Sequence, residues 1–145
     1  MDGTPFKGTI AEVLGIEFEE FTQERVVATM PVDARHHQPF GILHGGASVV
    51  LAETVASVGA FLNAGPGRTA VGLEVNANHI RPKRSGLVRA VATPAHVGRT
   101  SSVWEVRISD EAGRLICISR CTLAFTPLPE GADGRAAAEG DRVDP

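Results

Sequence analysis

Apolar residues recur along the chain in two different rhythms, and these rhythms predict most of its elements. Residues 10–14 have apolar positions at helical spacing and are followed by Gly15, which predicts a short helix. Residues 45–62 are almost continuously apolar and too long for a strand, which predicts a second helix. Alternating or β-branched runs predict strands over residues 16–20, 25–31, 69–80, 87–97, 101–109 and 115–125.

The long apolar helix decides the fold class. A lone helix that is apolar nearly all round must be covered on most sides. We therefore expect an α+β domain in which a curved antiparallel sheet wraps around one central helix. The chain of 145 residues has room for one such domain, which we place at residues 1–126. Residues 127–145 are rich in Gly, Ala, Pro and acidic residues without periodicity, which predicts a disordered acidic tail.

Composition excludes several other classes of protein. Apolar residues make up 43% and charged residues 21%, as in globular proteins. The longest apolar run contains a carboxylate and is short for a membrane span, and the first residues lack a signal-peptide pattern. We therefore expect a cytoplasmic protein that binds no membrane. Cys117 and Cys121 lie in one predicted strand, about 13 Å apart, which excludes a disulfide between them and indicates no metal site.

Basic residues are concentrated in one part of the chain. The tail holds five acidic and two basic residues, which accounts for the whole net charge of −3 and leaves residues 1–126 neutral. Within that neutral body, residues 75–104 contain no acidic residue and five basic ones, Arg81, Lys83, Arg84, Arg89 and Arg99. A local charge of this kind predicts a site for a compact anion, although a solvated face is the simple alternative. The segment is too small and too poor in aromatic residues for a nucleic-acid groove.

The long apolar helix contains one carboxylate, Glu53. A buried, unpaired carboxylate costs several kcal/mol, and burial raises its pKa. Proteins use such groups as bases or nucleophiles near neutral pH. The alternatives are that Glu53 reaches the surface or pairs with an arginine. Ser57, one helical turn later, continues a polar stripe and favours a functional site.

A glycine pair, Gly45 and Gly46, opens the same helix after Gln38 and His44. Backbone N–H groups at a helix start lack partners within the helix, and the helix dipole favours negative charge there, which suits an oxyanion hole. Gly45 and Glu53 are about 12 Å apart along a helix, whereas both must come within roughly 3 Å of one carbonyl. A two-fold dimer with antiparallel helices satisfies this requirement, because each site then uses both subunits.

Three motifs carry a resemblance to a known family. They are QPFGILHGGASVVLAETVAS, VGLEVNANHIRP and GRLICISR. Together they resemble the hotdog-fold acyl-CoA thioesterases of the phenylacetic-acid type. The similarity is greatest to the glutamate-dependent branch that contains 4-hydroxybenzoyl-CoA and 1,4-dihydroxy-2-naphthoyl-CoA thioesterases. It covers roughly residues 10–126 and implies a five- or six-stranded sheet on one helix. It also implies a homodimer with composite sites, assembled further into a dimer-of-dimers tetramer.

The resemblance also implies roles for individual residues. Glu53 corresponds to the catalytic carboxylate, as nucleophile or as general base, and the Gly45 N–H to the group that polarises the thioester carbonyl. Gln38 orients the carbonyl or the water, His44 lies at the helix mouth, and Ser57 supplies a hydroxyl. His79 lines the channel for the acyl group and the pantetheine. The positions that correspond to CoA contacts are Gly72, Ile80, Arg81, Pro82, Arg84, His96, Val97, Gly98, Arg99, Thr100 and Ser101. The walls expected for an aromatic ring are Phe40, Val58 and Phe61.

These observations predict an enzyme that hydrolyses an aryl acyl-CoA to the free acid and CoA. No metal or redox cofactor is implied, since CoA is part of the substrate. Two alternatives stay open: a hotdog dehydratase of 3-hydroxyacyl thioesters that uses His44 and Glu53, and a non-catalytic acyl-CoA binding module.

The sequence supports smaller predictions for other residues. His36 and His37 are expected to be solvated loop residues, and Trp104 to lie in the core. Glu74 is expected to pair with a nearby arginine or lysine. His96 can equally be a surface residue at a strand end.

Overall fold

In the computed structural model, which describes residues 4–132, six strands and one long helix make up the domain. β1 (Glu17–Phe21) and β2 (Val26–Val32) precede the long helix α2 (Gly45–Asn63), and a short helix α1 (Ile10–Val13) precedes both. The strands β3 (Arg68–His79), β4 (Gly86–Val97), β5 (Ser101–Asp110) and β6 (Leu115–Pro127) follow. Two 3₁₀ turns lie at Thr4–Phe6 and Ala34–His36. Every predicted helix and strand is therefore confirmed, with bounds that differ by at most two residues.

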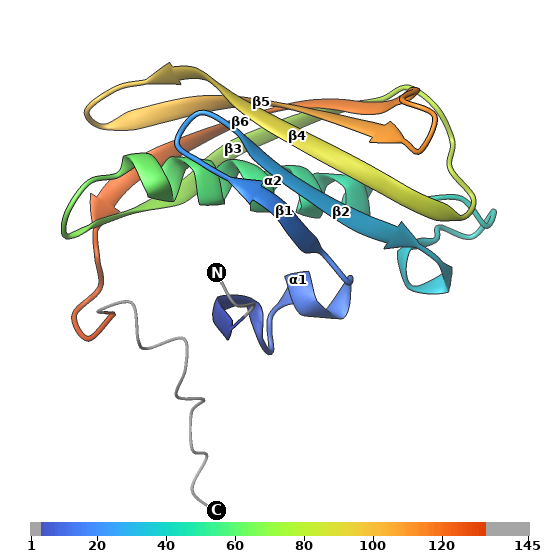
Figure 1. The fold of residues 1–145 in the computed structure, drawn as a ribbon, viewed down its shortest axis with the longest axis horizontal. Helices are drawn as coiled ribbons and strands as arrows, with labels where there is room; N and C mark the ends of the chain where they lie inside the picture. Colours follow the sequence, from blue (N-terminus) through green and yellow to red (C-terminus); the bar gives the residue numbers. More distant parts are fainter. Residues whose placement is uncertain (1–3, 133–145) are drawn as a thin grey trace, which may run out of the picture.

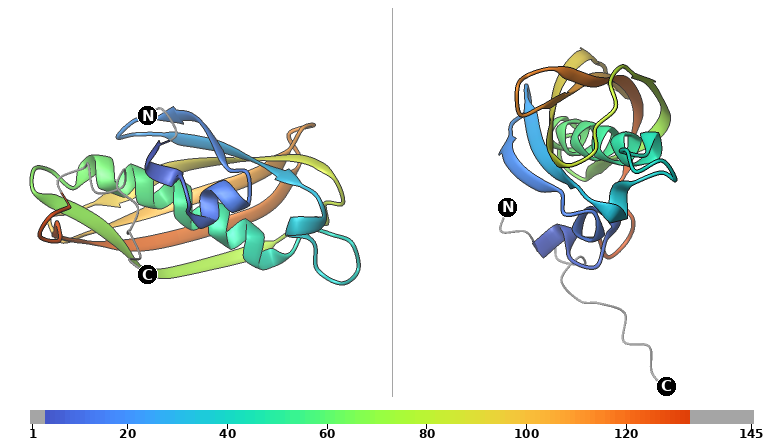
Figure 2. Two further views of the ribbon diagram at one scale, coloured as in Figure 1. Left: turned by 90° about the horizontal axis from the view of Figure 1, so that it is seen from below. Right: turned by 90° about the vertical axis from the view of Figure 1, so that its right-hand side faces the viewer.

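The six strands form a single antiparallel sheet in the order β1-β2-β4-β5-β6-β3. α2 lies along its concave side (Figure 1), and the end-on view in Figure 2 shows the sheet curling around the helix. The predicted fold class, a curved sheet wrapped around one central helix, is confirmed. Among residues 4–132, α2 is the one helix that is long and apolar enough to cross a membrane. Here the sheet packs along it instead.

The core lies between α2 and the inward-facing residues of the sheet. Trp104 on β5 is fully buried, as predicted, and its ring lies against Gly59 of α2. A Cβ atom on Gly59 would lie 2.4 Å from that ring, so only glycine allows this close packing. Cys117 and Cys121 are buried free thiols, as the strand spacing predicted. Burial raises the pKa of the Cys121 thiol to about 12, which keeps it uncharged.

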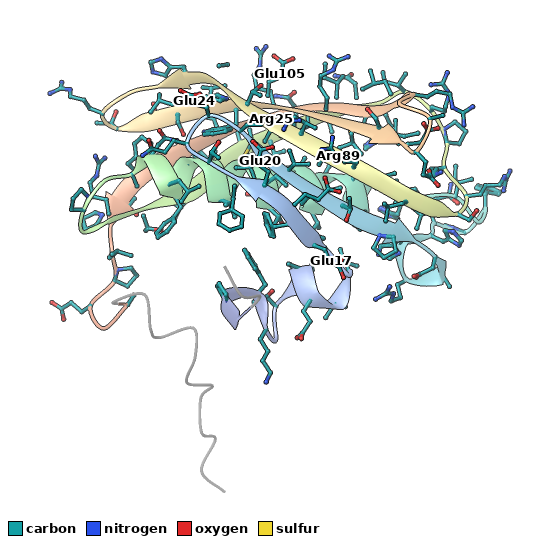
Figure 3. All side chains as sticks on the ribbon, viewed as in Figure 1. Glu17, Glu20, Glu24, Arg25, Arg89 and Glu105 are labelled. Atoms are coloured by element: carbon teal, nitrogen blue, oxygen red, sulfur yellow. The ribbon has the colours of Figure 1, made fainter. Side chains whose placement is uncertain are left out.

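Charged side chains cover the outer face of the sheet (Figure 3). Arg25 pairs with Glu20 beside the β1–β2 turn, and Arg89 Nε lies 2.8 Å from Glu19 Oε2. Such exposed ion pairs contribute little to stability. They do show which side of the sheet is solvated, and hence that the chemistry must be sought on the inner side, around α2.

Residues 4–14, here called the N-terminal segment, lie beneath α2 on the side that the sheet leaves open (Figure 1). The Phe6 ring stacks on Phe18, with centroids 4.8 Å apart, and Arg35 Nη1 donates to the Val13 carbonyl at 2.8 Å. His36 Nε2 lies 2.8 Å from the Leu14 carbonyl oxygen. The segment is thus fixed to the body of the domain at both ends.

The prediction of solvated loop histidines is wrong for His36 and holds only in part for His37. His36 is only 1% exposed, and its Nδ1 accepts the Asp33 N–H at 3.2 Å while Nε2 faces Leu14 O. His37 is half-buried, with Nε2 2.7 Å from the Arg84 carbonyl oxygen. Both rings make these contacts because the loop folds between the N-terminal segment and the β3–β4 connection.

The domain extends slightly beyond the predicted boundary at residue 126. Pro127 is the last residue of β6 and pairs with Arg68, and the Leu128 N–H donates to the Gly67 carbonyl at 3.0 Å. Residues 133–145, the greater part of the predicted disordered tail, lie outside the described residues.

Candidate active site

The start of α2 leaves one backbone N–H without a partner. The His44 side chain caps the helix, since its Nδ1 accepts the Gly46 N–H at 2.7 Å. The N–H groups of Ala47 and Ser48 donate to the His44 carbonyl oxygen. The Gly45 N–H has no acceptor among residues 4–132. An unsatisfied N–H at the positive end of a long helix is suited to stabilise a developing oxyanion.

His79 and Gln38 surround this N–H. A Cβ atom on Gly45 would lie 2.6 Å from His79 Nε2, so the imidazole can pack here only because residue 45 is glycine. The Gln38 carboxamide oxygen accepts the Phe40 N–H, which leaves the Nε2 hydrogens of Gln38 free to donate. Gln38, Gly45 and His79 line a cavity of about 460 Å³ together with Arg81.

The loop that carries Gln38 is held in place by the β3–β4 connection. The Leu43 N–H donates to the Lys83 carbonyl at 2.7 Å, and the His44 N–H donates to the His36 carbonyl at 2.7 Å. With the contact between His37 and Arg84 already described, these bonds fix the loop at both ends. Gln38 and Gly45 are therefore preorganised with respect to each other.

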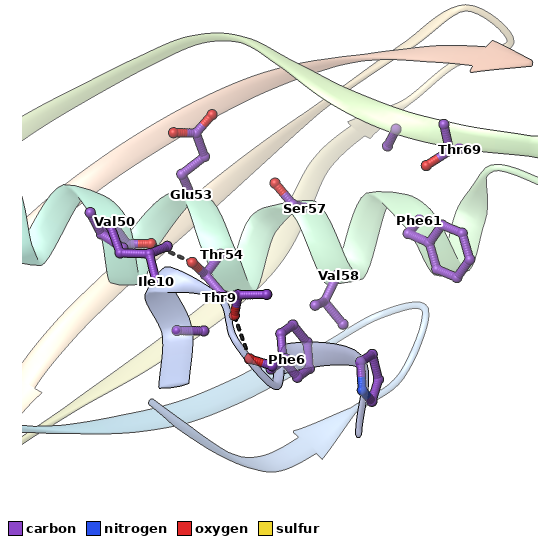
Figure 4. A pocket seen from close by; sticks show the side chains of 13 residues that line it. Phe6, Thr9, Ile10, Val50, Glu53, Thr54, Ser57, Val58, Phe61 and Thr69 are labelled. Atoms are coloured by element: carbon purple, nitrogen blue, oxygen red, sulfur yellow. Dashed lines mark hydrogen bonds between the residues drawn. The ribbon is translucent and has the colours of Figure 1, made fainter. Parts of the chain in front are cut away.

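Glu53 lies in the middle of α2 and points toward β3 (Figure 4). It is half-buried and takes part in no ion pair among the described residues. Its position is set by packing, because a Cβ atom on Gly72 would lie 2.2 Å from Glu53 Oε1. The sheet register shifts between Gly72 and Glu74, a β-bulge, where β3 passes the carboxylate.

A second cavity, of about 680 Å³, surrounds Glu53. Ser57, Val58 and Phe61 line it as the sequence predicts, while Thr69 and the N-terminal segment were not predicted. No local pattern marks these residues, because only the tertiary fold brings them to α2. Phe40, expected as another wall of the acyl site, is 82% exposed on its loop and lines neither of the two cavities of the single chain, so its contact with an acyl group stays a prediction.

The two cavities have no lining residue in common. Gly45 and Gln38 belong to one, and Glu53 and Ser57 to the other. Along α2 the two groups are separated by about 12 Å. Within one chain, the oxyanion donor and the carboxylate therefore cannot reach the same carbonyl.

The basic segment does not form a single patch in one chain. β4 runs from the end that carries Arg81 and Arg84 to the end that carries residues 96–101, a length of about 36 Å. Two of the five charges are also neutralised, because Lys83 pairs with Glu111 and Arg89 with Glu19. The prediction of one compact anion site within the chain is therefore wrong. The positions expected to contact CoA fall into two groups at the two ends of β4, apart from Gly72, which lies on β3 against Glu53.

At the first end of β4, the exposed Arg81 and Arg84 make only backbone contacts among the described residues. Arg81 Nη1 donates to the Leu115 carbonyl at 3.2 Å, and Arg84 Nη1 lies 3.5 Å from the Phe40 carbonyl oxygen. Ile80 and Pro82, beside them, line the Gly45 cavity.

At the other end of β4, His96 and the residues up to Ser101 form the turn into β5. The His96 ring lies against Gly98, and Arg68 Nη2 donates to the Arg99 carbonyl at 2.6 Å. Val97 and Thr100 are exposed there.

Glu74 does not pair with a basic residue. Its carboxylate accepts from Asn76 Nδ2 at 3.2 and 3.3 Å and enters no ion pair among residues 4–132, so the predicted pairing is wrong. Residues 74 and 76 share one face of β3, since side chains alternate along a strand, which brings Glu74 beside Asn76 instead.

Comparison with known proteins identifies the family. The model of the thioesterase superfamily matches residues 40–117. The 1,4-dihydroxy-2-naphthoyl-CoA hydrolase of Escherichia coli (strain K12) is 51% identical, with 82% of this chain and 88% of that one covered. The proofreading thioesterase EntH of Cronobacter turicensis is 50% identical, with 81% and 85% covered. The crystal structure of a thioesterase from Haemophilus influenzae superposes with a TM-score of 0.82 at 48% identity, covering 88% of this chain and 89% of that one.

The chain belongs to the thioesterase superfamily. The family resemblance found in the sequence, the hotdog fold and the assignment to the thioester hydrolases are confirmed.

Proposed function

We propose that the protein hydrolyses aryl acyl-CoA thioesters at a site shared by two copies of the chain. The main support is the separation of the Gly45 N–H and the Glu53 carboxylate into two cavities of one chain. If two copies pair with their α2 helices antiparallel, Glu53 of one copy faces Gly45 of the other. Each dimer then contains two complete sites.

The edge of the sheet supports this mode of pairing. β3 is a 12-residue edge strand whose other edge is unpaired within residues 4–132, and its apolar Val71 and Leu73 are 45% and 64% exposed. Long exposed edges of this kind are prone to pair with another strand. Pairing of β3 with the same strand of a second copy would extend the sheet and place the two α2 helices side by side. Assembly of such dimers into a tetramer stays a prediction.

The chemistry follows from the groups in the joined site. The thioester carbonyl oxygen accepts from the Gly45 N–H, and Gln38 Nε2 donates to that oxygen or to the water. Glu53 then either attacks the carbonyl carbon or removes a proton from a water that attacks it. In the first route CoA leaves as thiolate, and water cleaves the resulting anhydride. In the second route the proton held by Glu53 goes to the leaving sulfur.

In both routes the Gly45 N–H stabilises the negative charge that develops on the carbonyl oxygen. Removal of a single oxyanion donor of this kind typically costs about 10²- to 10³-fold in kcat.

The same pairing brings the two basic groups together. Antiparallel helices place the Arg81 and Arg84 end of one copy beside the other copy's turn at residues 96–101. Exposed arginines suit the phosphates of CoA, which they can hold through charge-assisted hydrogen bonds. The aryl acyl group is supported by the apolar side chains of Val58 and Phe61, which line the Glu53 cavity. It is also supported by the 51% identical relative named 1,4-dihydroxy-2-naphthoyl-CoA hydrolase.

Release of free CoA tests the activity. The full chain is mixed with benzoyl-CoA and a thiol reagent, and Glu53→Ala serves as the matched control. Steady release by the wild-type chain and its loss in the variant support hydrolysis. A dehydratase would convert 3-hydroxyacyl-CoA without releasing thiol, and a binding module would retain benzoyl-CoA intact.

Mixing two inactive variants tests the shared site. Glu53→Ala and Gly45→Val chains are co-expressed, so that mixed dimers form. One of the two sites in each mixed dimer then has both intact groups, and random pairing should restore about a quarter of wild-type activity. Recovery of none of the activity, with mixed dimers present by mass spectrometry, would mean that each site is contained in one chain.

A further inference from the structure

A single ion pair among residues 4–132 involves the β3–β4 connection, residues 80–85. It joins Lys83 of this connection to Glu111, at the start of the β5–β6 turn. The Lys83 side chain is only 15% exposed, so solvent and salt screen this pair less than an exposed pair on the outer face of the sheet. The connection, the turn and the loop of residues 37–44 that leads into α2 lie at the same end of the domain (Figures 1 and 2).

Glu111 holds both the connection and the start of β4. One of its carboxylate oxygens accepts from the Lys83 ammonium, and the other accepts the Leu87 N–H at 3.3 Å. Gly86 allows this approach, because it has a φ of +86° and a Cβ atom there would clash with Glu111 Oε2. The hydrogen bond from Lys83 also keeps the pKa of the Glu111 carboxyl below its usual value, so the carboxylate is charged at neutral pH.

Lys83 connects this ion pair to the loop of residues 37–44 through its own backbone. Its carbonyl oxygen accepts the Leu43 N–H at 2.7 Å. The Lys83 ammonium is thus fixed on the β5–β6 turn, while its carbonyl holds the residue two before Gly45. If the ion pair is broken, the connection loses its attachment to that turn, and the loop that carries Gln38 can shift with it.

We propose that Lys83 and Glu111 are positioning residues for the oxyanion-binding donors at the start of α2. These donors are the Gly45 N–H and Gln38 Nε2. The inference rests on the proposed function, and the two charged residues act through the loop and not on the substrate. A displacement of about 1 Å at a reacting group can cost up to 10²-fold in rate, and because backbone bonds still hold the loop we expect a fall in kcat of about fivefold.

Two single variants test this proposal against the other role that Lys83 could have. In Lys83→Met, which keeps the apolar stem, and in Glu111→Gln, kcat for benzoyl-CoA should fall about fivefold. If Lys83 instead held a phosphate of CoA, Glu111→Gln would free its charge, lower KM and leave kcat unchanged. That result would overturn the proposal.

Three controls sharpen the comparison. The N-acetylcysteamine thioester of benzoate lacks the phosphates, and both variants should lose the same factor in kcat with it. The double variant should lose no more than either single one, whereas losses that multiply would mean that the two residues act independently. Glu19→Gln breaks the ion pair with Arg89 on the outer face of the sheet and should leave kcat unchanged.

Hydrogen exchange separates failure of this inference from failure of the proposed function. The Leu43 amide exchanges when its bond to the Lys83 carbonyl opens, so Lys83→Met and Glu111→Gln should raise its exchange rate about fivefold and Glu19→Gln should not. Unchanged exchange in both variants, or faster exchange with unchanged kcat, would overturn the inference. Absent hydrolysis by the wild-type chain would overturn the proposed function, and the exchange rates would still decide whether the pair holds the loop.

Discussion

The two halves of the candidate site are held in opposite ways. At the mouth of α2, His44 caps Gly46 and the Phe40 N–H fixes the Gln38 carboxamide oxygen, so that the Gly45 N–H and Gln38 Nε2 are left to donate. In the middle of α2, the Glu53 carboxylate packs against Gly72 and has no hydrogen bond or ion pair with any other residue that the structure describes. A group that stabilises developing charge works best when its neighbours hold it rigidly. A carboxylate that attacks or removes a proton works best when no hydrogen bond stabilises its charged form.

The largest effect on kcat should come from replacing Glu53, the carboxylate in the middle of α2. Glu53→Ala removes the only carboxylate of its cavity and should lower kcat by at least about 10²-fold, with substrate binding largely kept. Glu53→Gln, which preserves the shape, should be almost as inactive. Steady-state kinetics with benzoyl-CoA give both values. Turnover of Glu53→Ala near the wild-type rate would remove the central assignment.

At the start of α2, a single added methyl group on Gly45 should lower kcat. In Gly45→Ala the new Cβ would meet the His79 ring at 2.6 Å, so either the ring or the helix start must move. We expect kcat to fall by about tenfold to 100-fold. The upper value is what the complete loss of one oxyanion donor costs at the least. The same substitution in a His79→Ala background should cost much less, because the clash is absent. An equal loss in both backgrounds would mean that the His79 contact does not position the N–H.

Gly72→Ala tests whether packing alone positions Glu53. The added methyl would lie 2.2 Å from Oε1 and must displace the carboxylate. A displacement of about 1 Å at a reacting group can cost up to 10²-fold, and we expect a fall in kcat of about tenfold. In a Glu53→Ala background the same substitution should have no further effect on the residual rate. A further loss there would indicate damage to β3 instead.

The sequence predicted the elements well because hydrophobic periodicity is local. Glu53 and Gly45 could also be singled out as candidates, since a lone carboxylate in an apolar helix and a glycine pair at its start are visible in one segment, and their roles stay predictions. The contacts that hold them were not predictable, because His79 on Gly45 and Gly72 on Glu53 depend on how β3 passes α2. His36 was misjudged for the same reason: its burial depends on the distant Leu14 carbonyl.

Charge counting along the chain failed where three-dimensional pairing mattered. Five basic residues in an acid-free segment predicted one anion site. Glu111 and Glu19, which lie far away in sequence, neutralise two of them. The length of β4 then separates Arg81 and Arg84 from Arg99, so the three remaining charges cannot hold one compact anion within a single chain.

The smallest effects should come from these exposed arginines, which are expected to hold the phosphates of CoA and not the reacting carbonyl. Arg81→Ala and Arg84→Ala should each raise KM for benzoyl-CoA several-fold and leave kcat nearly unchanged, because a phosphate contact binds the ground state and the transition state alike. Both effects should shrink as salt rises, since exposed charges are screened within about 10 Å at 0.1 M. Steady-state kinetics at two salt concentrations measure this.

Arg89→Ala is the matched control, because Arg89 already pairs with Glu19 on the outer face and should change KM little. The N-acetylcysteamine thioester of benzoate provides the second control, because it lacks the nucleotide and its phosphates. With it, Arg81→Ala and Arg84→Ala should behave like the wild-type chain. Equal losses on both substrates would mean that these arginines support the fold or the subunit interface, and the phosphate assignment would be wrong.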